Sequence, residues 1–431
     1  MLGEQFGTFM IAMVDTVLAG QISKEATAAV GTAAYMGWFF MVAFQLLAIG
    51  SAALVARLFG ERKIKTAERA LNQAVLSAAV LGAILSIAVY NAAPLLAGAL
   101  MQTQVSYDLC VTYLRIDALG FLLASVHYIG AAVLRGGGDT RTPMAVMLIV
   151  NVINVFLSLA LVYGWFGPEL GVLGIAIGTV VAKSVGGLLM CGVLAAGKLG
   201  LRLRLSLLRP DFALIWRMAR IGLPSFAEAM VMWSANLVFM IFINMTAAGD
   251  AATVNYSAHI IAIRLEGITY LPAMAWMTAS ATMIGQYLGA GQPEKARRVG
   301  HIAALQGAAL TTGVGIIFFL FAEPIFAGMT SEHAVRAVGA PAFKIMALVQ
   351  PFLAMGIIYG GSLRGAGDTR WPMVITFFTS VCIRLPGAYI GGVVLDGGLI
   401  GAWCGMWADN IIRFLLMLGR YLHGGWRRVK V

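Results

Sequence analysis

The chain has 431 residues, of which 60% are hydrophobic and 11% are charged, and its formal net charge is +11. Water-soluble domains carry about 25% charged residues, so this composition excludes a soluble globular protein. The positive charges lie in short loops between apolar runs, without a basic face interleaved with aromatic side chains, which argues against nucleic-acid binding.

Apolar runs of about 20 residues, long enough to cross the hydrocarbon core of a bilayer, recur along the whole chain. We therefore predict an all-α polytopic membrane protein with 12 transmembrane helices. Turn sequences rich in glycine, aspartate and proline separate the spans. The expected spans cover residues 2–21, 28–56, 71–98, 107–134, 143–166, 171–197, 214–246, 253–288, 299–325, 336–363, 373–394 and 398–422.

Two stretches far apart in the chain are nearly the same. Leu134–Met144 reads LRGGGDTRTPM and Leu363–Met373 reads LRGAGDTRWPM, so nine of eleven positions match at an offset of 229 residues. The chain is therefore a duplication of a six-span unit. Internal repeats are typical of secondary transporters, whose binding site lies between the repeats near the bilayer midplane. At the same offset Met1 aligns with Met230, before which the second half has an opening at Pro224. We expect either that the sequence begins inside a longer one or that its first span is short.

Loops that follow the even-numbered spans carry most of the lysine and arginine, whereas the opposite loops hold only Lys24 and Arg336. Positive charge marks the cytoplasmic side, so we expect both termini in the cytoplasm and a location in the inner membrane of a bacterium. We predict an N-lobe over residues 1–200, a basic cytoplasmic linker over 201–220 and a pseudo-symmetric C-lobe over 221–431.

Asp15 is a carboxylate in the middle of the first span, where ionisable groups are costly and by default mark a functional site. An aspartate in a low-dielectric site exchanges a proton when a cation or another conformation arrives. The alternative is a structural carboxyl bonded to hydroxyls and amides, with nearby polar groups acting as interhelical hydrogen-bond glue. Helical spacing places the polar residues of span 5 on one face. We predict a cation-coupling group of Asp15, Asn151, Asn154, Ser158 and Thr179.

The second half has acids of its own in spans 7 and 8. Glu228 lies one turn after Pro224, and Glu266 follows Arg264 by two residues. A cavity of carboxylates, aromatic rings and methionines suits a large amphipathic cation. The alternatives are a water-exposed or interlobe bond for Glu228 and a local pair with Arg264 for Glu266. The residues expected to contact substrate are Glu228, Glu266, Tyr35, Tyr270 and Met274.

The repeated stretches contribute four charged residues, Arg135 and Asp139 with their counterparts Arg364 and Asp368. Although rich in glycine, these stretches lack the lysine pattern of a phosphate-binding P-loop and do not follow a strand. We expect them to cap hairpins and to serve in cytoplasmic gating.

Other charged groups inside the spans are interpreted as structural. Arg384 aligns with Val155 of the first half, and we expect it to pair with Asp409 or Glu266, whereas Lys344 has no apparent partner. The four cysteines lack CxxC spacing, so we expect no metal site, no disulfide and no cofactor.

These features resemble the multidrug and toxic compound extrusion (MATE) family of secondary transporters over nearly the whole chain. The resemblance implies two six-helix bundles facing each other in a V, which export amphipathic organic cations in exchange for H⁺ or Na⁺. Asp15 matches the N-lobe coupling aspartate of the family, and Asn154 matches a nearby asparagine. Ser158 falls where many members carry a second acid or an asparagine, and span 10 has no acid, which favours H⁺. The motifs that carry the resemblance are Val14-Asp15-Thr16 with Ala19-Gly20, the paired LRGxGDTRxPM stretches, Gly222-Leu223-Pro224 followed by Glu228, and Ile284-Gly285-Gln286 followed by Leu288-Gly289-Ala290-Gly291.

We therefore expect a proton-coupled antiporter for drugs and dyes that acts as a monomer among membrane lipids and is not an enzyme. The alternative is a lipid-linked saccharide flippase of the same superfamily, which needs a markedly basic cavity; Asp15, Glu228 and Glu266 oppose it. A prenyl-group transferase would need clustered aspartates for Mg²⁺, and a channel would need a symmetric selectivity filter. The sequence shows neither.

Overall fold

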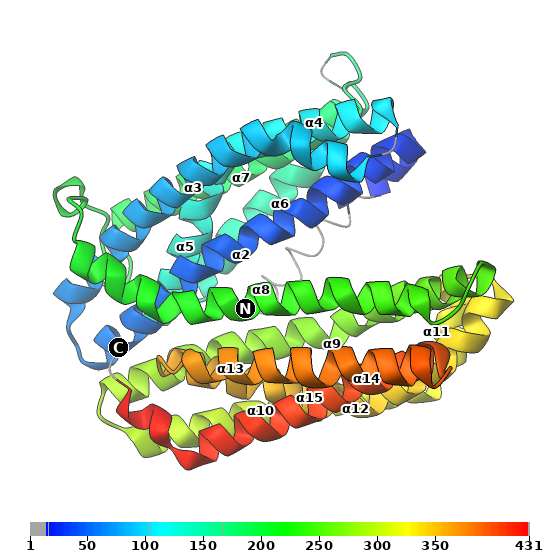
Figure 1. The fold of residues 1–431 in the computed structure, drawn as a ribbon. Helices are drawn as coiled ribbons and strands as arrows, with labels where there is room; N and C mark the ends of the chain where they lie inside the picture. Colours follow the sequence, from blue (N-terminus) through cyan, green and yellow to red (C-terminus); the bar gives the residue numbers. More distant parts are fainter. Residues whose placement is uncertain (1–13, 16, 102, 166, 430–431) are drawn as a thin grey trace. The chain divides into compact units, whose positions relative to one another are not determined.

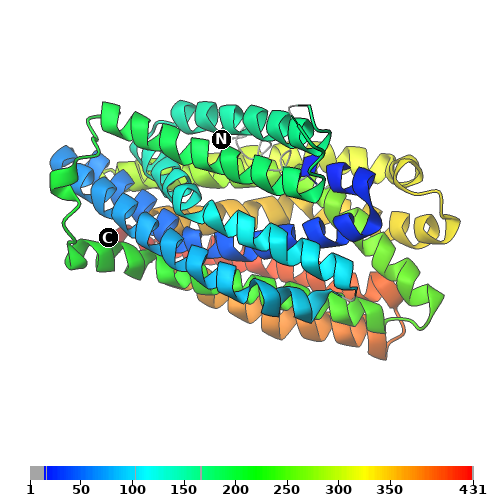
Figure 2. The same cartoon turned by 90° about the horizontal axis from the view of Figure 1, so that it is seen from above.

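The structure is a computed structural model that describes residues 14–15, 17–101, 103–165 and 167–429. The described chain is built of helices, with one isolated β-bridge between Lys198 and Leu201. It forms two compact units, Met1–Gly222 and Leu223–Val431. Within each unit the helices run alongside one another (Figures 1 and 2).

The first unit ends inside a helix, because its last residues are the beginning of α8. Most of the predicted first span lies outside the described residues, which are helical at 14–15 and 17–22. The helices that follow are α2 (Lys24–Gly60), α3 (Ile64–Leu100), α4 (Gln104–Leu119), α5 (Phe121–Gly137), α6 (Arg141–Val162), α7 (Val172–Ala196), a 3₁₀ turn (Leu205–Leu207) and α8 (Phe212–Met245).

The second unit contains the remainder of α8 and the helices that follow it. Its eleventh predicted span is interrupted by two π-helical segments, Thr379–Arg384 and Ile390–Val394, which are frequent at functional sites. The other elements are α9 (Asp250–Gly289), α10 (Pro293–Leu320), α11 (Ala322–Met329), α12 (His333–Gly365), α13 (Arg370–Phe378), α14 (Leu385–Tyr389), α15 (Gly398–His423) and a 3₁₀ turn (Gly425–Arg428).

Ten helices of the described chain are long and apolar enough to cross a bilayer, and α4 with α5 makes an eleventh. With the first span, this agrees with the 12-helix, two-lobed fold predicted from the sequence. The span predicted over 107–134 is bent, because α4 and α5 meet at an angle of 54°. Gly120 ends α4 with a short turn in which its amide donates to the Asp117 carbonyl.

The start of α8 packs tightly against α2 within the first unit. A Cβ added at Gly222 would lie 1.6 Å from the carbonyl oxygen of Leu46, and one at Gly50 would lie 2.0 Å from that of Met218. Glycine lets two helix backbones approach in this way inside a membrane. The contact therefore depends on having no side chain at these two positions.

The segment before α8 is held on the side of α3 by two buried amides. Asn72 donates to the carbonyl of Arg202, and Gln73 donates to the carbonyls of Leu207 and Arg209 at 2.8 and 2.9 Å. The Asp211 amide donates back to Gln73 at 2.9 Å. Because these bonds satisfy backbone groups of an irregular segment, the basic linker predicted over 201–220 is an ordered part of the first unit.

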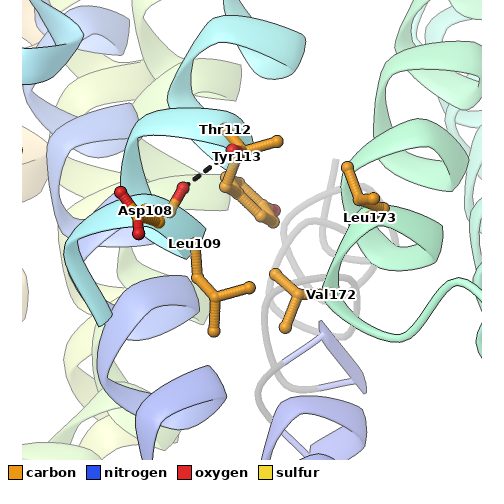
Figure 3. Close-up of a pocket in the computed structure, with 6 residues that line it drawn as sticks. All are labelled: Asp108, Leu109, Thr112, Tyr113, Val172 and Leu173. Atoms are coloured by element: carbon orange, nitrogen blue, oxygen red, sulfur yellow. Dashed lines mark hydrogen bonds between the residues drawn. The ribbon is translucent and has the colours of Figure 1, made fainter. Parts of the chain in front are cut away.

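A shallow cavity of ≈ 130 Å³ lies between α4 and α7 (Figure 3). Its walls are mainly apolar, and a drug-sized ligand needs roughly 300 Å³ or more. Since this hollow is too small for such a ligand, we assign it no function. The residues that line it are Asp108, Leu109, Thr112, Tyr113, Val172 and Leu173.

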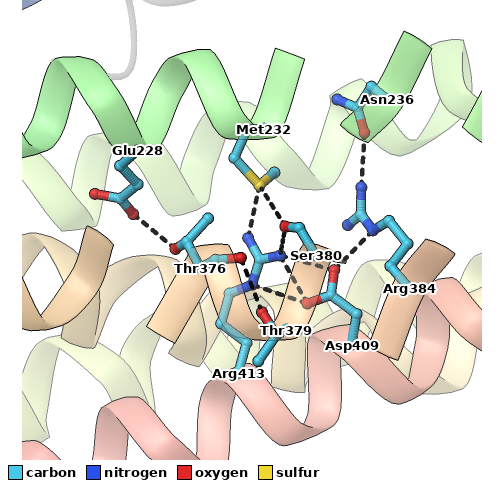
Figure 4. Close-up of polar contacts among 9 residues, drawn as sticks. All are labelled: Glu228, Met232, Asn236, Thr376, Thr379, Ser380, Arg384, Asp409 and Arg413. Carbon is cyan, nitrogen blue, oxygen red and sulfur yellow. Dashed lines mark hydrogen bonds and ion pairs between the residues drawn. The ribbon is translucent and has the colours of Figure 1, made fainter. Parts of the chain in front are cut away.

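A buried ionic cluster ties α8, the first π-helical segment and α15 together in the second unit (Figure 4). Asp409 is fully buried; it accepts from Arg384 at 2.7 Å and from Arg413 at 2.7 Å. Arg384 also donates to Asn236 at 2.6 Å, and Arg413 donates to Ser380 at 3.0 Å. The predicted pairing of Arg384 with Asp409 is thus confirmed.

Lys344 was predicted to have no partner, and that prediction was wrong. Its ammonium contacts Glu323 at 2.9 Å. The two residues are 21 positions apart on α11 and α12, so no local sequence pattern connects them. The pair is exposed, and exposed pairs contribute little to stability.

We expect Gly222→Ala to lower the melting temperature of the purified protein. The new methyl group would clash with the α2 backbone, at a cost of about 1–3 kcal/mol. Gly192→Ala is the matched control, because a Cβ there meets nothing within 4 Å. Equal melting temperatures for the two variants would contradict the close α2–α8 contact.

We expect Asp409→Asn to be strongly destabilising, because it leaves two buried guanidinium groups without their shared carboxylate. Breaking a buried pair in this way costs about 3–5 kcal/mol. Glu323→Gln, which breaks the exposed pair with Lys344, should leave the melting temperature almost unchanged. If the two variants have the same melting temperature, Asp409 does not stabilise the cluster.

Candidate functional site

Asp15 lies in a buried hydrogen-bonded chain that joins the first span to α6 and α7. Its side chain is 6% exposed, and its Oδ2 accepts from the Thr179 hydroxyl at 3.0 Å. Thr179 in turn accepts from the Asn154 amide at 3.0 Å. The structure thus brings together three of the five residues predicted to form the cation-coupling group.

The predicted cation-coupling group contains buried oxygen atoms that have no hydrogen-bond partner among the described residues. They are Oδ1 of Asp15, Oδ1 of Asn154, Oδ1 of Asn151 and Oγ of Ser158. Ser158 packs against α7 beside Thr179, since a Cβ at Gly178 would lie 2.6 Å from the Ser158 Oγ. Unpartnered buried acceptors are costly, so these atoms can receive a proton donor or a small cation.

Another buried carboxylate of the first unit, Asp117, is neutralised by an ion pair with Lys183 of α7. Asp15 forms no such pair with any residue that the structure describes. Its repeat counterpart Asn244 is an exposed residue of α8 that donates to the Met240 carbonyl. Asp15 therefore combines burial, an ionisable group and neutral hydrogen-bond donors.

Glu228, the acid of α8, is held by two neighbouring helices of the second unit. Its Oε1 accepts from the Thr376 hydroxyl at 2.9 Å and from the Arg364 guanidinium at 3.2 Å. The side chain of Glu228 is 10% exposed. Figure 4 shows the carboxylate directed from α8 toward Thr376.

Glu266 of α9 lies close enough to the buried ionic cluster to interact with it electrostatically. The charges of Glu266 and Arg384 act on each other. One turn further along α9, Thr269 donates to Gln350 of α12 at 2.7 Å. The local pair with Arg264 does not form within the described residues, so the alternative interpretation of Glu266 was wrong.

The remaining predicted substrate residues differ in burial. Tyr270 is 43% exposed and Met274 is half-buried, both on α9 after Glu266. Tyr35 is 44% exposed and belongs to α2 of the first unit. Their part in substrate binding stays a prediction.

The two repeated loops have the same backbone and different side-chain contacts. Gly138 and Gly367 both have positive φ, at +100° and +87°, where glycine is favoured. Asp139 caps the next helix: although partial burial raises its pKa, hydrogen bonds from the Thr142 hydroxyl and from the Thr142 and Arg141 amides hold it below the usual range.

Asp368, the counterpart of Asp139, instead binds Arg420 of α15 at 2.7 Å. Sequence reasoning placed Arg364 and Asp368 in a capping and gating loop, and it missed that Arg364 reaches Glu228. The only signal in the sequence was that Arg364 and Glu228 both belong to motifs singled out above. These two residues lie 136 positions apart.

The chain matches known proteins over almost its whole length. The MatE family model matches residues 1–160 and 224–390. A probable multidrug resistance protein NorM of Thermotoga maritima is 32% identical over 99% of this chain and 91% of the relative. The multidrug resistance protein MdtK of Pectobacterium atrosepticum is 27% identical over 92% of this chain and 87% of the relative.

Solved structures show the same fold. A multidrug resistance MATE family transporter in an outward-facing conformation superposes with a TM-score of 0.91 at 19% identity, covering 100% of this chain and 95% of that one. A MATE structure in a bent conformation has a TM-score of 0.90 and covers 98% and 92%. The family match over residues 1–160 and 224–390, together with the Thermotoga maritima relative at 32% identity, shows that the chain belongs to the MatE family of multi-pass membrane transporters.

Proposed function

We propose that the protein is a secondary antiporter that exports amphipathic organic cations in exchange for inward H⁺ by alternating access. Asp15 would carry the coupling proton. The observation that carries the proposal is the burial of Asp15 among neutral donors and unpartnered oxygens, without an ion pair in the described residues. A carboxyl group in such a site changes its protonation state when its surroundings change.

The arrangement around Asp15 favours a proton over Na⁺. A protonated Asp15 becomes a hydrogen-bond donor, and Asn154 and Ser158 offer buried acceptors that lack a partner among the described residues. Thr179 already donates to Asp15, which stabilises the ionised form after the proton leaves. The residues at this site supply one carboxylate together with amide and hydroxyl oxygens, whereas cation-binding sites usually gather more charge.

The substrate would contact the acids of the second unit. Glu228 and Glu266 supply negative charge, while Tyr270 and Met274 supply aromatic and polarizable surface for an organic cation. The relatives named as multidrug resistance proteins support this substrate class.

A lipid-linked saccharide flippase is the alternative function, and the described charges disfavour it. Arg364, Arg384 and Arg413 of the second unit each contact a carboxylate. A pyrophosphate-bearing lipid would need arginines that are free to bind it.

We further propose that the protein acts as a monomer in a bacterial inner membrane, with both termini in the cytoplasm. The support is the lysine and arginine content of the loops after even-numbered spans. The repeated loops, with Arg135 and Asp139 in one and Arg364 and Asp368 in the other, would then lie at the cytoplasmic ends of their helices.

The test is ethidium efflux in everted vesicles under a proton gradient or a sodium gradient, each imposed alone. We expect the proton gradient to drive efflux by the wild type, and Asp15→Asn to reduce efflux to the level of vesicles without the protein, because an amide cannot carry the proton. Asn244→Ala, which changes the exposed repeat counterpart, should transport normally.

Transport by Asp15→Asn at the wild-type rate would refute the coupling role. Efflux driven by sodium alone would replace H⁺ with Na⁺ as the coupling ion. If folded, inserted protein moves no organic cation under either gradient, the flippase becomes the better explanation.

A further inference from the structure

We propose that Arg364 is an internal competitor for the Glu228 carboxylate, which a substrate cation must displace in order to bind there. Arg364 would thereby set the affinity and the selectivity of this subsite. The inference rests on the proposed role of Glu228 as a substrate ligand and adds a specificity-determining residue to it.

The geometry of Glu228 leaves room for exchange. Arg364 and Thr376 both donate to Oε1 of the carboxylate. The other oxygen, Oε2, accepts no hydrogen bond from the described residues, and it is not among the enclosed polar atoms without a partner. A second cation can therefore approach the carboxylate at Oε2 before the contact at Oε1 is broken.

The bond from Arg364 is loose in comparison with the other arginine contacts of the same unit. It is a single contact of 3.2 Å, whereas charge-assisted bonds between arginine and carboxylate are normally about 2.7–2.9 Å. Arg384 and Arg413 both reach Asp409 at 2.7 Å. Among the ion pairs of the second unit that the structure describes, the Glu228 pair is the longest, which favours exchange.

Arg364 is also poorly held by its other neighbours. Its Nη1 contacts the sulfur of Met277 at 3.5 Å, and its Nε is buried without a hydrogen-bond partner in the part of the chain that the structure describes. Asp368, four residues along the chain, is already occupied by Arg420 at 2.7 Å. Glu228 is thus the one carboxylate that Arg364 contacts among the described residues.

An exchange of cations at Glu228 keeps the buried carboxylate neutralised throughout. Arg364 lies in the last turn of α12, and its side chain is 18% exposed, more than the 10% of Glu228, so it can turn toward water when displaced. A strongly hydrated ion must lose its water to compete, which is costly in a buried site. Competition by Arg364 therefore selects for weakly hydrated organic cations.

Binding at Glu228 and the position of Arg364 are linked in both directions, as in any coupling between two sites. A bound cation frees Arg364 from α8, and so loosens the start of the loop Arg364–Arg370 that joins α12 to α13. Conversely, a conformation that presses Arg364 against Glu228 expels the cation. This gives the repeated loop a part in substrate release.

The test is equilibrium binding of tetraphenylphosphonium to the purified full-length protein at pH about 8, where ordinary carboxylates are ionised. We expect Arg364→Gln to lower the dissociation constant about tenfold, within the usual range of coupling between sites. Glu228→Gln should weaken binding, and the double variant should bind like Glu228→Gln, because the competitor matters only when its target is present.

Glu323→Gln is the matched control, since it breaks the ion pair with Lys344 and leaves Arg364, Glu228 and Asp368 with their partners. Its affinity should equal that of the wild type. If Arg364→Gln does not fold, Arg364→Lys takes its place; the shorter side chain reaches less far, so binding should again become tighter. If a folded Arg364 variant binds no more tightly than the wild type while Glu228→Gln binds more weakly, the competition by Arg364 is refuted. The proposed function is not affected by that result. Wild-type affinity in Glu228→Gln instead refutes the substrate role of Glu228 itself.

Discussion

The side chain of Asp409 on α15 is fully buried, and its carboxylate accepts hydrogen bonds from the guanidinium groups of Arg384 and Arg413. The organisation of the second unit depends on that contact. An ionised side chain inside a membrane bundle needs an opposite charge or several hydrogen bonds, because neither lipid nor apolar side chains can solvate it. Asp409 accepts hydrogen bonds from both Arg413 and Arg384. Glu266 supplies a second negative charge that acts on Arg384. With Glu228 and Arg364 added, three acids face three arginines. This group of six charged side chains is therefore close to neutral.

The first unit resolves the same constraint differently. Lys183 neutralises Asp117, but Asp15 relies on the hydroxyl of Thr179 and, beyond it, the amide of Asn154. Neutral donors stabilise an ionised carboxylate less than a fixed positive charge does. Asp15 can consequently be protonated without leaving an unpaired cation behind, whereas protonation of Asp409 or Asp117 would strand a buried arginine or lysine. The first unit thus contains, beside the paired Asp117, a buried acid that has no ion pair among the described residues.

Much of this could be predicted from the sequence, because it depends on patterns that are local or repeated. Span positions follow from apolar run length, and the grouping of Asp15 with Asn154 and Thr179 followed from helical spacing and the cost of polar groups in lipid. The contacts that sequence reasoning missed depend on how helices pack. Arg364 reaches Glu228 across 136 positions, Lys344 finds Glu323 on another helix, and α4 turns away from α5 at a single glycine. The rotation of each helix about its axis and the angle at which helices cross determine these contacts, and neither can be predicted from the periodicity of one segment.

The docking of the linker on α3 has a mechanical consequence. Since Asn72 and Gln73 hold the segment up to Asp211, and α8 then packs against α2 as far as Gly222, this loop moves as part of the first unit. The boundary between the units falls inside α8, after Gly222 and beside Pro224, whose ring removes one backbone hydrogen bond of the helix. If alternating access changes the angle between the units, α8 must bend near Pro224, where the helix lacks one backbone hydrogen bond. A flexing helix has a restoring force and a preferred direction, which a slack loop would lack.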